Sequence, residues 1–233
     1  MPADPVDWQV VARNLPEHAR NPIHTDAGAQ AAGFPRALVA GVTTYGYLTQ
    51  PMITAWGEQW VAHGGGEVRF RRPVFDGDLV RCAVSHDGDA VLVQAITDEP
   101  EQPRALFRAI REGGVHPAMR EGEPLLTREL RLTGEWGVEH SPGSGICHPA
   151  TWPLLANHIV HTQVARGSWI HTRSIVRHHA LAGVGDLAVV SATVVRRFES
   201  HGERAVVDVH VQVGDTVVAS LEHEAIVALP ATS

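Results

Sequence analysis

The sequence predicts an α+β protein made of two similar units, each with one long helix followed by several antiparallel strands. Apolar residues recur at helical spacing from near Gly41 to Glu58, and short strand-like segments bounded by turn residues come after them. The same order of patterns returns after residue 148. The segment VRFRRPVFDGD at 68–78 also matches VRHHALAGVGD at 176–186, so Val, Arg, Gly and Asp coincide 108 positions apart. A repeat of this kind predicts two fused copies of one unit.

Composition and charge exclude several classes of protein. The chain has 233 residues, of which 44% are apolar and 19% charged, which is typical of a soluble protein that can bury a core. Its net charge of -7 argues against a nucleic-acid partner, because phosphate binding relies on clustered Lys and Arg. The N-terminus lacks a signal-peptide pattern and no segment approaches the roughly 18 apolar residues of a membrane span. We therefore expect a cytoplasmic protein without membrane contact.

Cysteine and histidine spacing gives no indication of a metal or disulfide framework. Cys82 and Cys147 lie far apart without a CxxC pattern. Among the fifteen histidines, His158 and His161 share an expected helix face, but no HExxH motif or third ligand accompanies them. We expect no metal and no cofactor.

The N-terminal unit is predicted to span residues 1–115. Its helix begins near Gly41, and Pro51 is expected to kink or divide it, because a proline inside a helix removes a hydrogen bond and clashes with the preceding turn. A bend there would widen any tunnel under the helix. Strands are expected within 67–88, 90–99 and 104–113.

The rest of the chain is predicted to form a linker and a second unit. Residues 116–147 are rich in Gly, Pro and charge and form the expected linker, with a short strand near Leu130 to Leu132. The second unit spans 148–233 and opens with a helix over 148–165, in which Thr151 is the expected N-cap and Pro153 lies in the first turn. Strands are expected within 167–195, 204–214 and 216–229.

The stretch ARNPIHTD at 19–26 joins an Asn-Pro turn to a histidine and a carboxylate. An imidazole with an ordinary pKa near 6.5 suits proton transfer at neutral pH, so His24 is a candidate general base. Downstream, the small residues Val39-Ala40-Gly41 lead into the long helix, whose N-terminus offers unpaired N–H groups and a positive dipole end.

These motifs, in this order and followed by VRFRRPVFDGD, resemble the MaoC-like hydratases and dehydratases of the hotdog superfamily. The resemblance covers about the first 110 residues, and the second half looks like a degenerate copy. It implies a double hotdog in which one chain mimics a dimer, and an acyl thioester substrate carried on coenzyme A or an acyl carrier protein. Whether the chain also forms a homodimer stays open.

The resemblance also implies the roles of individual residues. The expected catalytic residues are His24, Asn21 and Gly41: His24 would act as general acid and base, Gly41 N–H would donate to the oxyanion, and Asn21, the turn residue of the motif, would orient His24. The family motif carries a catalytic aspartate two residues before the asparagine, where this chain has Ala19. The remaining expected substrate-binding residues are Ala40, Val42, Tyr45 and Asp26.

Loss of that aspartate leaves three hypotheses open. The chain is a hydratase or dehydratase that works with His24, an isomerase or cyclase with altered chemistry on a polyketide-type acyl chain, or a non-catalytic acyl-binding protein. A thioesterase is disfavoured because no carboxylate lies between Gly41 and Trp56. One active site per chain is expected. The basic cluster Arg69, Arg71 and Arg72 is either a solvated strand face or a contact for a carrier phosphate.

Overall fold

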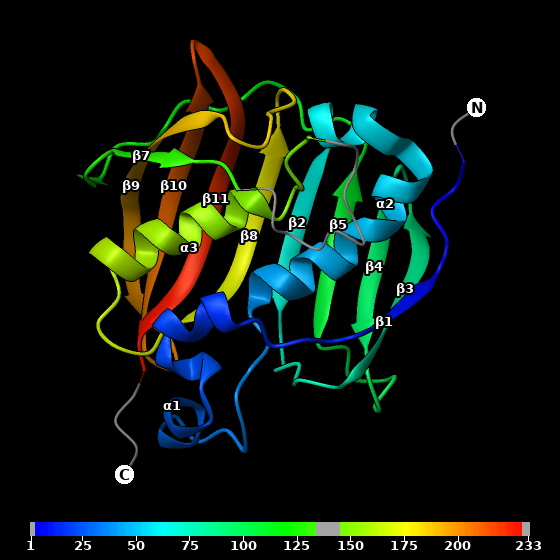
Figure 1. Ribbon diagram of the computed structural model, residues 1–233, viewed down its shortest axis with the longest axis vertical. Helices are drawn as coiled ribbons and strands as arrows, with labels where there is room; N and C mark the ends of the chain where they lie inside the picture. The colour runs from blue at the N-terminus through cyan, green and yellow to red at the C-terminus, as the bar shows by residue number, and fades with distance from the viewer. Residues whose placement is uncertain (1–2, 134–144, 230–233) are drawn as a thin grey trace.

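The computed structural model describes residues 3–133 and 145–229, and its strands form one large antiparallel sheet. The sheet has eleven strands, of which ten run in the order β1-β3-β4-β5-β2-β8-β11-β10-β9-β6, and β7 pairs with β9 beside them. Both long helices lie on the same face of the sheet, α2 over the first half and α3 over the second (Figure 1). The predicted succession of helix and antiparallel strands, repeated twice, is confirmed.

The elements follow the sequence patterns closely. The first half contains β1 (Trp8–Val11), the short 3-10 helices η1 (Pro16–Arg20) and η2 (Pro22–His24), α1 (Asp26–Ala31), α2 (Gly41–His63), β2 (Gly65–Phe70), β3 (Leu79–Asp87), β4 (Ala90–Ile96) and β5 (Ala105–Ile110). The rest contains β6 (Glu123–Pro124), β7 (Arg128–Arg131), α3 (Thr151–Gln163), β8 (Ile170–His178), β9 (Leu187–Glu199), β10 (Glu203–Val213) and β11 (Thr216–Ala228).

The sequence repeat corresponds to a repeated turn before β3 and β9. In the first half the backbone N–H of Phe75 donates to Asp78 Oδ2 at 2.8 Å. In the second half the N–H of Gly183 donates to Asp186 Oδ2 at 2.7 Å. Because the shared Asp closes the same four-residue turn in each half, the sequence match has a structural cause.

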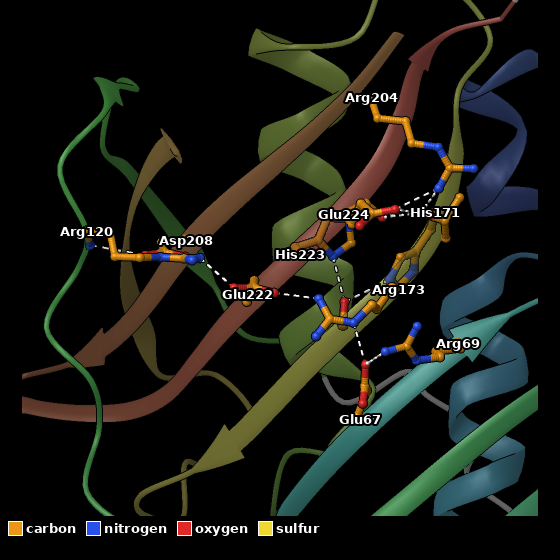
Figure 2. Close-up of polar contacts among 12 residues, drawn as sticks. Glu67, Arg69, Arg120, His171, Arg173, Arg204, Asp208, Glu222, His223 and Glu224 are labelled. Carbon is orange, nitrogen blue, oxygen red and sulfur yellow. Dashed lines mark hydrogen bonds and ion pairs between the residues drawn. The ribbon is translucent and has the colours of Figure 1, made fainter. Parts of the chain in front are cut away.

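The two halves meet where β2 pairs with β8. The pairing is antiparallel, with Val68 opposite Ser174, so the sheet continues from one half into the other. A chain of ion pairs also crosses this joint: Arg173 binds Glu67 of β2 and Glu222 of β11, and Glu222 binds Arg120 (Figure 2). Since these side chains remain partly exposed, the ion pairs stabilise the joint only modestly and help to fix the register of β2 against β8.

Helix α2 bends at Gly57 and stays helical through Pro51, so the prediction of a kink at Pro51 was wrong. Gly57 has φ 59° and ψ -151°, a conformation that suits glycine alone. Proline leaves the carbonyl of Tyr47 without its helical donor, and here Trp8 Nε1–H donates to that carbonyl at 2.9 Å while Cys82 Sγ lies at 3.4 Å. External donors therefore replace the lost helical bond.

The predicted linker includes chain that belongs to the second half of the sheet. β6 and β7 both pair with β9, and β7 covers most of the short strand predicted near Leu130 to Leu132. Residues 134–144 of the predicted linker lie outside the described residues. Helix α3 begins at Thr151 with Ala150 as its N-cap, one position before the predicted cap.

Apolar side chains fill the space between the helices and the sheet. Under α2, Tyr45 packs edge-on against Phe107 with ring centroids 5.2 Å apart, and Trp60 meets the same ring at 6.3 Å. None of the described helices is long and apolar enough to cross a bilayer.

Candidate active site

Two short 3-10 helices present His24 at the entrance to α2. The Asn21-Pro22 pair starts η2, which ends at His24. His24 Nδ1 lies 2.8 Å from the carbonyl oxygen of Leu38, and Asn14 Nδ2–H donates to the His24 carbonyl at 3.0 Å. A carbonyl can only accept, so Nδ1 carries the proton and Nε2 is left as an unprotonated base.

Burial keeps His24 neutral. The pKa of His24 is lowered to about 4, mainly because of burial; the hydrogen bond to Leu38 opposes this shift, and the neighbouring His18 adds a smaller lowering. At pH 7 the imidazole is therefore uncharged and ready to accept a proton. His18, whose ring centroid is 5.9 Å away, also has a pKa lowered to about 4 by burial.

His24 lines a cavity of about 240 Å³ between the two halves of the chain. The first half contributes the loop around His24, the start of α2 and the end of β2, and the second half contributes α3 and the start of β8. As far as the structure describes the chain, its lining holds no Asp or Glu. Its polar or aromatic lining residues include Asn21, His24, Thr44, Phe70, Arg71, Arg72, Asn157, Trp169, His171 and Arg204.

Gly41, the first residue of α2, lines this cavity. Its N-cap, Ala40, makes no side-chain capping bond, and the first intrahelical bond is donated by Thr44 N–H. A Cβ at Gly41 would lie 3.4 Å from both Phe70 and His171. Glycine therefore keeps the helix N-terminus open to an approaching ligand atom.

Asn21 ties the His24 loop to the second half. Its Nδ2–H donates to the Trp169 carbonyl at 2.8 Å, and its Oδ1 lies 3.4 Å from the Trp169 N–H. Asn21 is 6% exposed. Both polar atoms of the Asn21 side chain contact the backbone of Trp169, just before β8. This is the geometry of a positioning residue and not of an acid or base.

Four predicted substrate-binding residues lie outside the cavity lining. Ala40, Val42 and Tyr45 are buried in the core, with Tyr45 against Phe107. Asp26 Oδ1 accepts the N–H of Ala37 at 2.8 Å and lies by a separate shallow depression that also touches His24. Their predicted contact with substrate has no support in this geometry.

Ala19 faces a second, more open depression of about 540 Å³. His18, His24 and His158 share its lining. His18 Nε2 lies 3.2 Å from Thr43 Oγ1. At the position where the motif of the resembling family has a carboxylate, this depression has the methyl group of Ala19, and the carboxylate of Glu17 lines it two positions earlier.

The sequence analysis did not identify which side chains of the second half line the cavity. Asn157 on α3 has a buried Oδ1 without a hydrogen-bond partner among the described residues, and His171 on β8 has the same property at Nδ1. Helical spacing predicts on which side of α3 Asn157 lies. No local sequence pattern indicates that this side packs toward the His24 loop. Within the described ranges, no cluster of three His, Cys, Asp or Glu side chains suits a metal ion.

Comparisons with known proteins agree with this architecture. The family model of the MaoC-like domain matches residues 16–101. A solved MaoC-like dehydratase superposes with a TM-score of 0.60 at 12% identity, covering 98% of this chain and 99% of that one. The dehydratase domain of PpsC from Mycobacterium tuberculosis, solved with C12:1-CoA, gives 0.58 at 11%, covering 96% and 93%.

Thioesterases share the fold as well. The acyl-CoA thioesterase II TesB2 from Mycobacterium marinum gives a TM-score of 0.50 at 9% identity, covering 81% of this chain and 90% of that one. A search among curated protein sequences finds no significant match. The structural likenesses therefore establish the fold, and the choice of reaction rests on the site.

Proposed function

Residues 16–101 belong to the MaoC-like domain family, and from that premise we propose that the chain is a hydratase or dehydratase of acyl thioesters with His24 as its acid and base. The observation that carries the proposal is the hydrogen bond from His24 Nδ1 to the Leu38 carbonyl, which leaves Nε2 as a base in a cavity that Gly41 also lines. The two helix-and-sheet units are interpreted as the two halves of a double hotdog, with domains at 1–115 and 148–233 and the linker between them.

The proposed dehydration needs one proton carrier and one oxyanion site. His24 Nε2 removes the proton α to the thioester carbonyl, and the enolate oxygen receives the N–H of Gly41 at the positive end of α2. The C–O bond to the β-hydroxyl then breaks, and His24 returns its proton to the departing oxygen, releasing water. Hydration is the reverse. A single imidazole can perform both transfers when elimination is syn, which suits a lining without a carboxylate.

Arginines at the rim suit the anionic carrier of such a substrate. Arg71 and Arg72 are exposed at the end of β2 and line the same cavity as His24. A guanidinium binds phosphate oxygens in bidentate fashion. These two residues are therefore the proposed contacts for coenzyme A or for the phosphopantetheine of an acyl carrier protein.

Hydration of trans-2-butenoyl-CoA tests the proposal through loss of the conjugated thioester absorbance. His24→Ala is expected to lower turnover by about 10² or more, the usual scale for removing a general acid or base. His86→Ala, which removes an exposed histidine on β3, is the control and should retain activity.

Equal turnover in wild type and His24→Ala would contradict the role of His24. If the wild type binds acyl-CoA without hydrating it, the same His24 comparison is repeated with polyketide-type 3-hydroxyacyl thioesters. An isomerase or cyclase would then convert its substrate without release of water, and an acyl-binding protein would leave it unchanged.

A further inference from the structure

His171, on the second half of the chain, lines the cavity close to the start of α2. The nearest atom to a Cβ built on Gly41 is His171 Nδ1, at 3.4 Å. The ring also packs against Phe70, with centroids 4.7 Å apart. Nδ1 therefore lies beside the N-terminus of α2, in the cavity that both residues line.

A β-bulge turns His171 toward this point. In the pairing of β8 with β11, Arg173 faces Glu224 while His171 faces Ala225, so Thr172 is an extra residue in β8. The extra residue reverses the alternation of side chains, which places His171 on the buried face together with Ser174. Bulges that re-aim a side chain are over-represented beside active sites.

Nδ1 of His171 has no hydrogen-bond partner among the described residues, although the residue is only 6% exposed. An unpaired buried polar atom is destabilising, and such atoms are rare unless a ligand or water supplies the missing hydrogen bond. Burial holds the pKa of His171 well below its usual value, with His223 adding to the effect and the Arg173 backbone opposing it. The ring is therefore neutral and carries one proton.

Ser174 connects the other nitrogen of His171 to His223 on β11. His171 Nε2 lies 2.8 Å from Ser174 Oγ, which lies 2.9 Å from His223 Nδ1. Figure 2 shows the two labelled imidazoles on neighbouring strands with these contacts dashed. A hydroxyl has one proton to donate, so the two rings must carry complementary tautomers.

One of the two tautomer arrangements suits a ligand. If Ser174 donates to His171, the unpaired N–H is His171 Nδ1–H in the cavity, and His223 Nε2 is an unpaired acceptor. The reverse arrangement leaves an unpaired N–H on His223, which is 0% exposed and does not belong to the cavity lining. Because a buried unpaired N–H is the rarer case, the first arrangement is favoured.

We propose that His171 Nδ1–H is a second hydrogen-bond donor to the thioester carbonyl oxygen, beside the Gly41 amide, and that Ser174 and His223 hold its tautomer. The inference deepens the proposed function and rests on it. Two donors converging on one oxygen stabilise the enolate more than the neutral carbonyl, so they lower the barrier to α-proton removal. His171 is then a catalytic residue, and Ser174 and His223 are positioning residues.

Two substitutions of His171 separate the roles of its nitrogens. An Asn amide can present a donor near the Nδ1 position, whereas a Gln amide reaches the Nε2 position and the Ser174 contact. With trans-2-butenoyl-CoA, His171→Gln is expected to lower kcat by about 10²–10³ with a much smaller change in KM, the scale for losing one oxyanion donor. His171→Asn should recover a large part of that loss.

Binding provides a readout that does not need turnover. The affinity of butenoyl-CoA is compared with that of the thioether in which a CH₂ replaces the carbonyl, and the C=O stretching band of the bound [1-¹³C] thioester is recorded. Loss of a hydrogen bond in His171→Gln should reduce the preference for the thioester about five- to tenfold and move the band to higher frequency. His178→Gln is the matched control, because His178 is also buried on β8 but bonds the Trp60 carbonyl outside the cavity.

The outcomes separate this inference from the proposed function. If the wild type binds no acyl-CoA, both are overturned. If it binds the thioester, but His171→Gln and His178→Gln have the same band position and the same thioester preference as wild type, only the role of His171 is overturned. A kcat loss in both variants with unchanged spectra would indicate a packing defect and would also overturn it.

Discussion

The two halves keep the same turn before the sheet but differ in the chain that leads into the helix. Bridges Leu38–Phe75 and Ile146–Gly183 are 108 positions apart at both ends, as are the Asp-closed turns. Upstream the halves diverge: Leu38 follows Ala12 by 26 positions, whereas Ile146 follows Leu132 by 14, although both Ala12 and Leu132 donate to their turn in the same way. The extra chain of the first half is the segment that carries His24.

The comparison indicates that the repeat preserves the turns and strands of the two halves but not the residues of the proposed active site. The first half supplies the proposed base and helix N-terminus, and the second half supplies the facing wall with Asn157 and His171. The two long helices also differ in length. At the 108-residue offset α3 corresponds to Thr43 to Ala55 of α2, so the extension of α2 beyond Gly57 has no counterpart in α3.

The largest expected effect comes from cutting the link between the halves at Asn21. Asn21→Ala leaves the buried N–H and C=O of Trp169 without their side-chain partner, which should lower the free energy of unfolding by about 3 kcal/mol. The His24 loop should also lose its position, so turnover falls as well. Denaturant unfolding and the butenoyl-CoA assay measure the two effects.

Asn14→Ala is the control for that prediction. Asn14 also holds the His24 backbone, but it belongs to the first half alone. If both variants lose the same stability and activity, contact with the second half contributes nothing specific to the site.

A second prediction concerns the helix extension. Gly57→Ala forces a Cβ onto a backbone with φ 59° and ψ -151°, so stability should fall by about 1–3 kcal/mol although there is open space for the methyl group. Pro51→Ala should change stability by less than about 1 kcal/mol, because the Tyr47 carbonyl already has external donors. Thermal unfolding of the two variants measures both changes in stability. A larger loss in Pro51→Ala than in Gly57→Ala would contradict the assignment of the bend to Gly57.

The smallest effect tests the repeat itself. Asp78→Ala and Asp186→Ala remove equivalent bonds to Phe75 and Gly183, and each should cost about 1 kcal/mol. Asp78 also pairs with Arg36 at the surface, which adds little. Denaturant midpoints that differ by more than about 1 kcal/mol would show that the two turns are no longer equivalent.

Sequence patterns were sufficient to predict the helices, strands and turns that depend on residues close together in the sequence. Turn residues and alternation located the strands, and helical spacing located both long helices. The repeat at Val68 and Val176 was visible because its turn depends on one Asp side chain in each half. The motif around Asn21 and His24 indicated a turn that presents an imidazole, and the structure has that turn.

Other features depend on contacts that no local pattern contains. Simple alternation along β8 would place His171 with Arg173 on the outer face, and the bulge at Thr172 reverses this assignment. The bend at Gly57 was missed because a glycine is tolerated in many helices, whereas proline is a stronger local signal. The partner of Asn21 is Trp169, 148 residues away, and such pairs follow only from the assembled fold.

The β2–β8 joint also determines the order in which the molecule can assemble. β3 and β4 are separated by a two-residue turn and β10 and β11 by another, so these hairpins close early, whereas Gly65 meets Arg177 only after more than a hundred intervening residues have been organised. The cavity spans this joint. During folding, secondary structure should therefore form well before the His24 loop meets β8, and the ability to bind a ligand should be the last property the chain acquires.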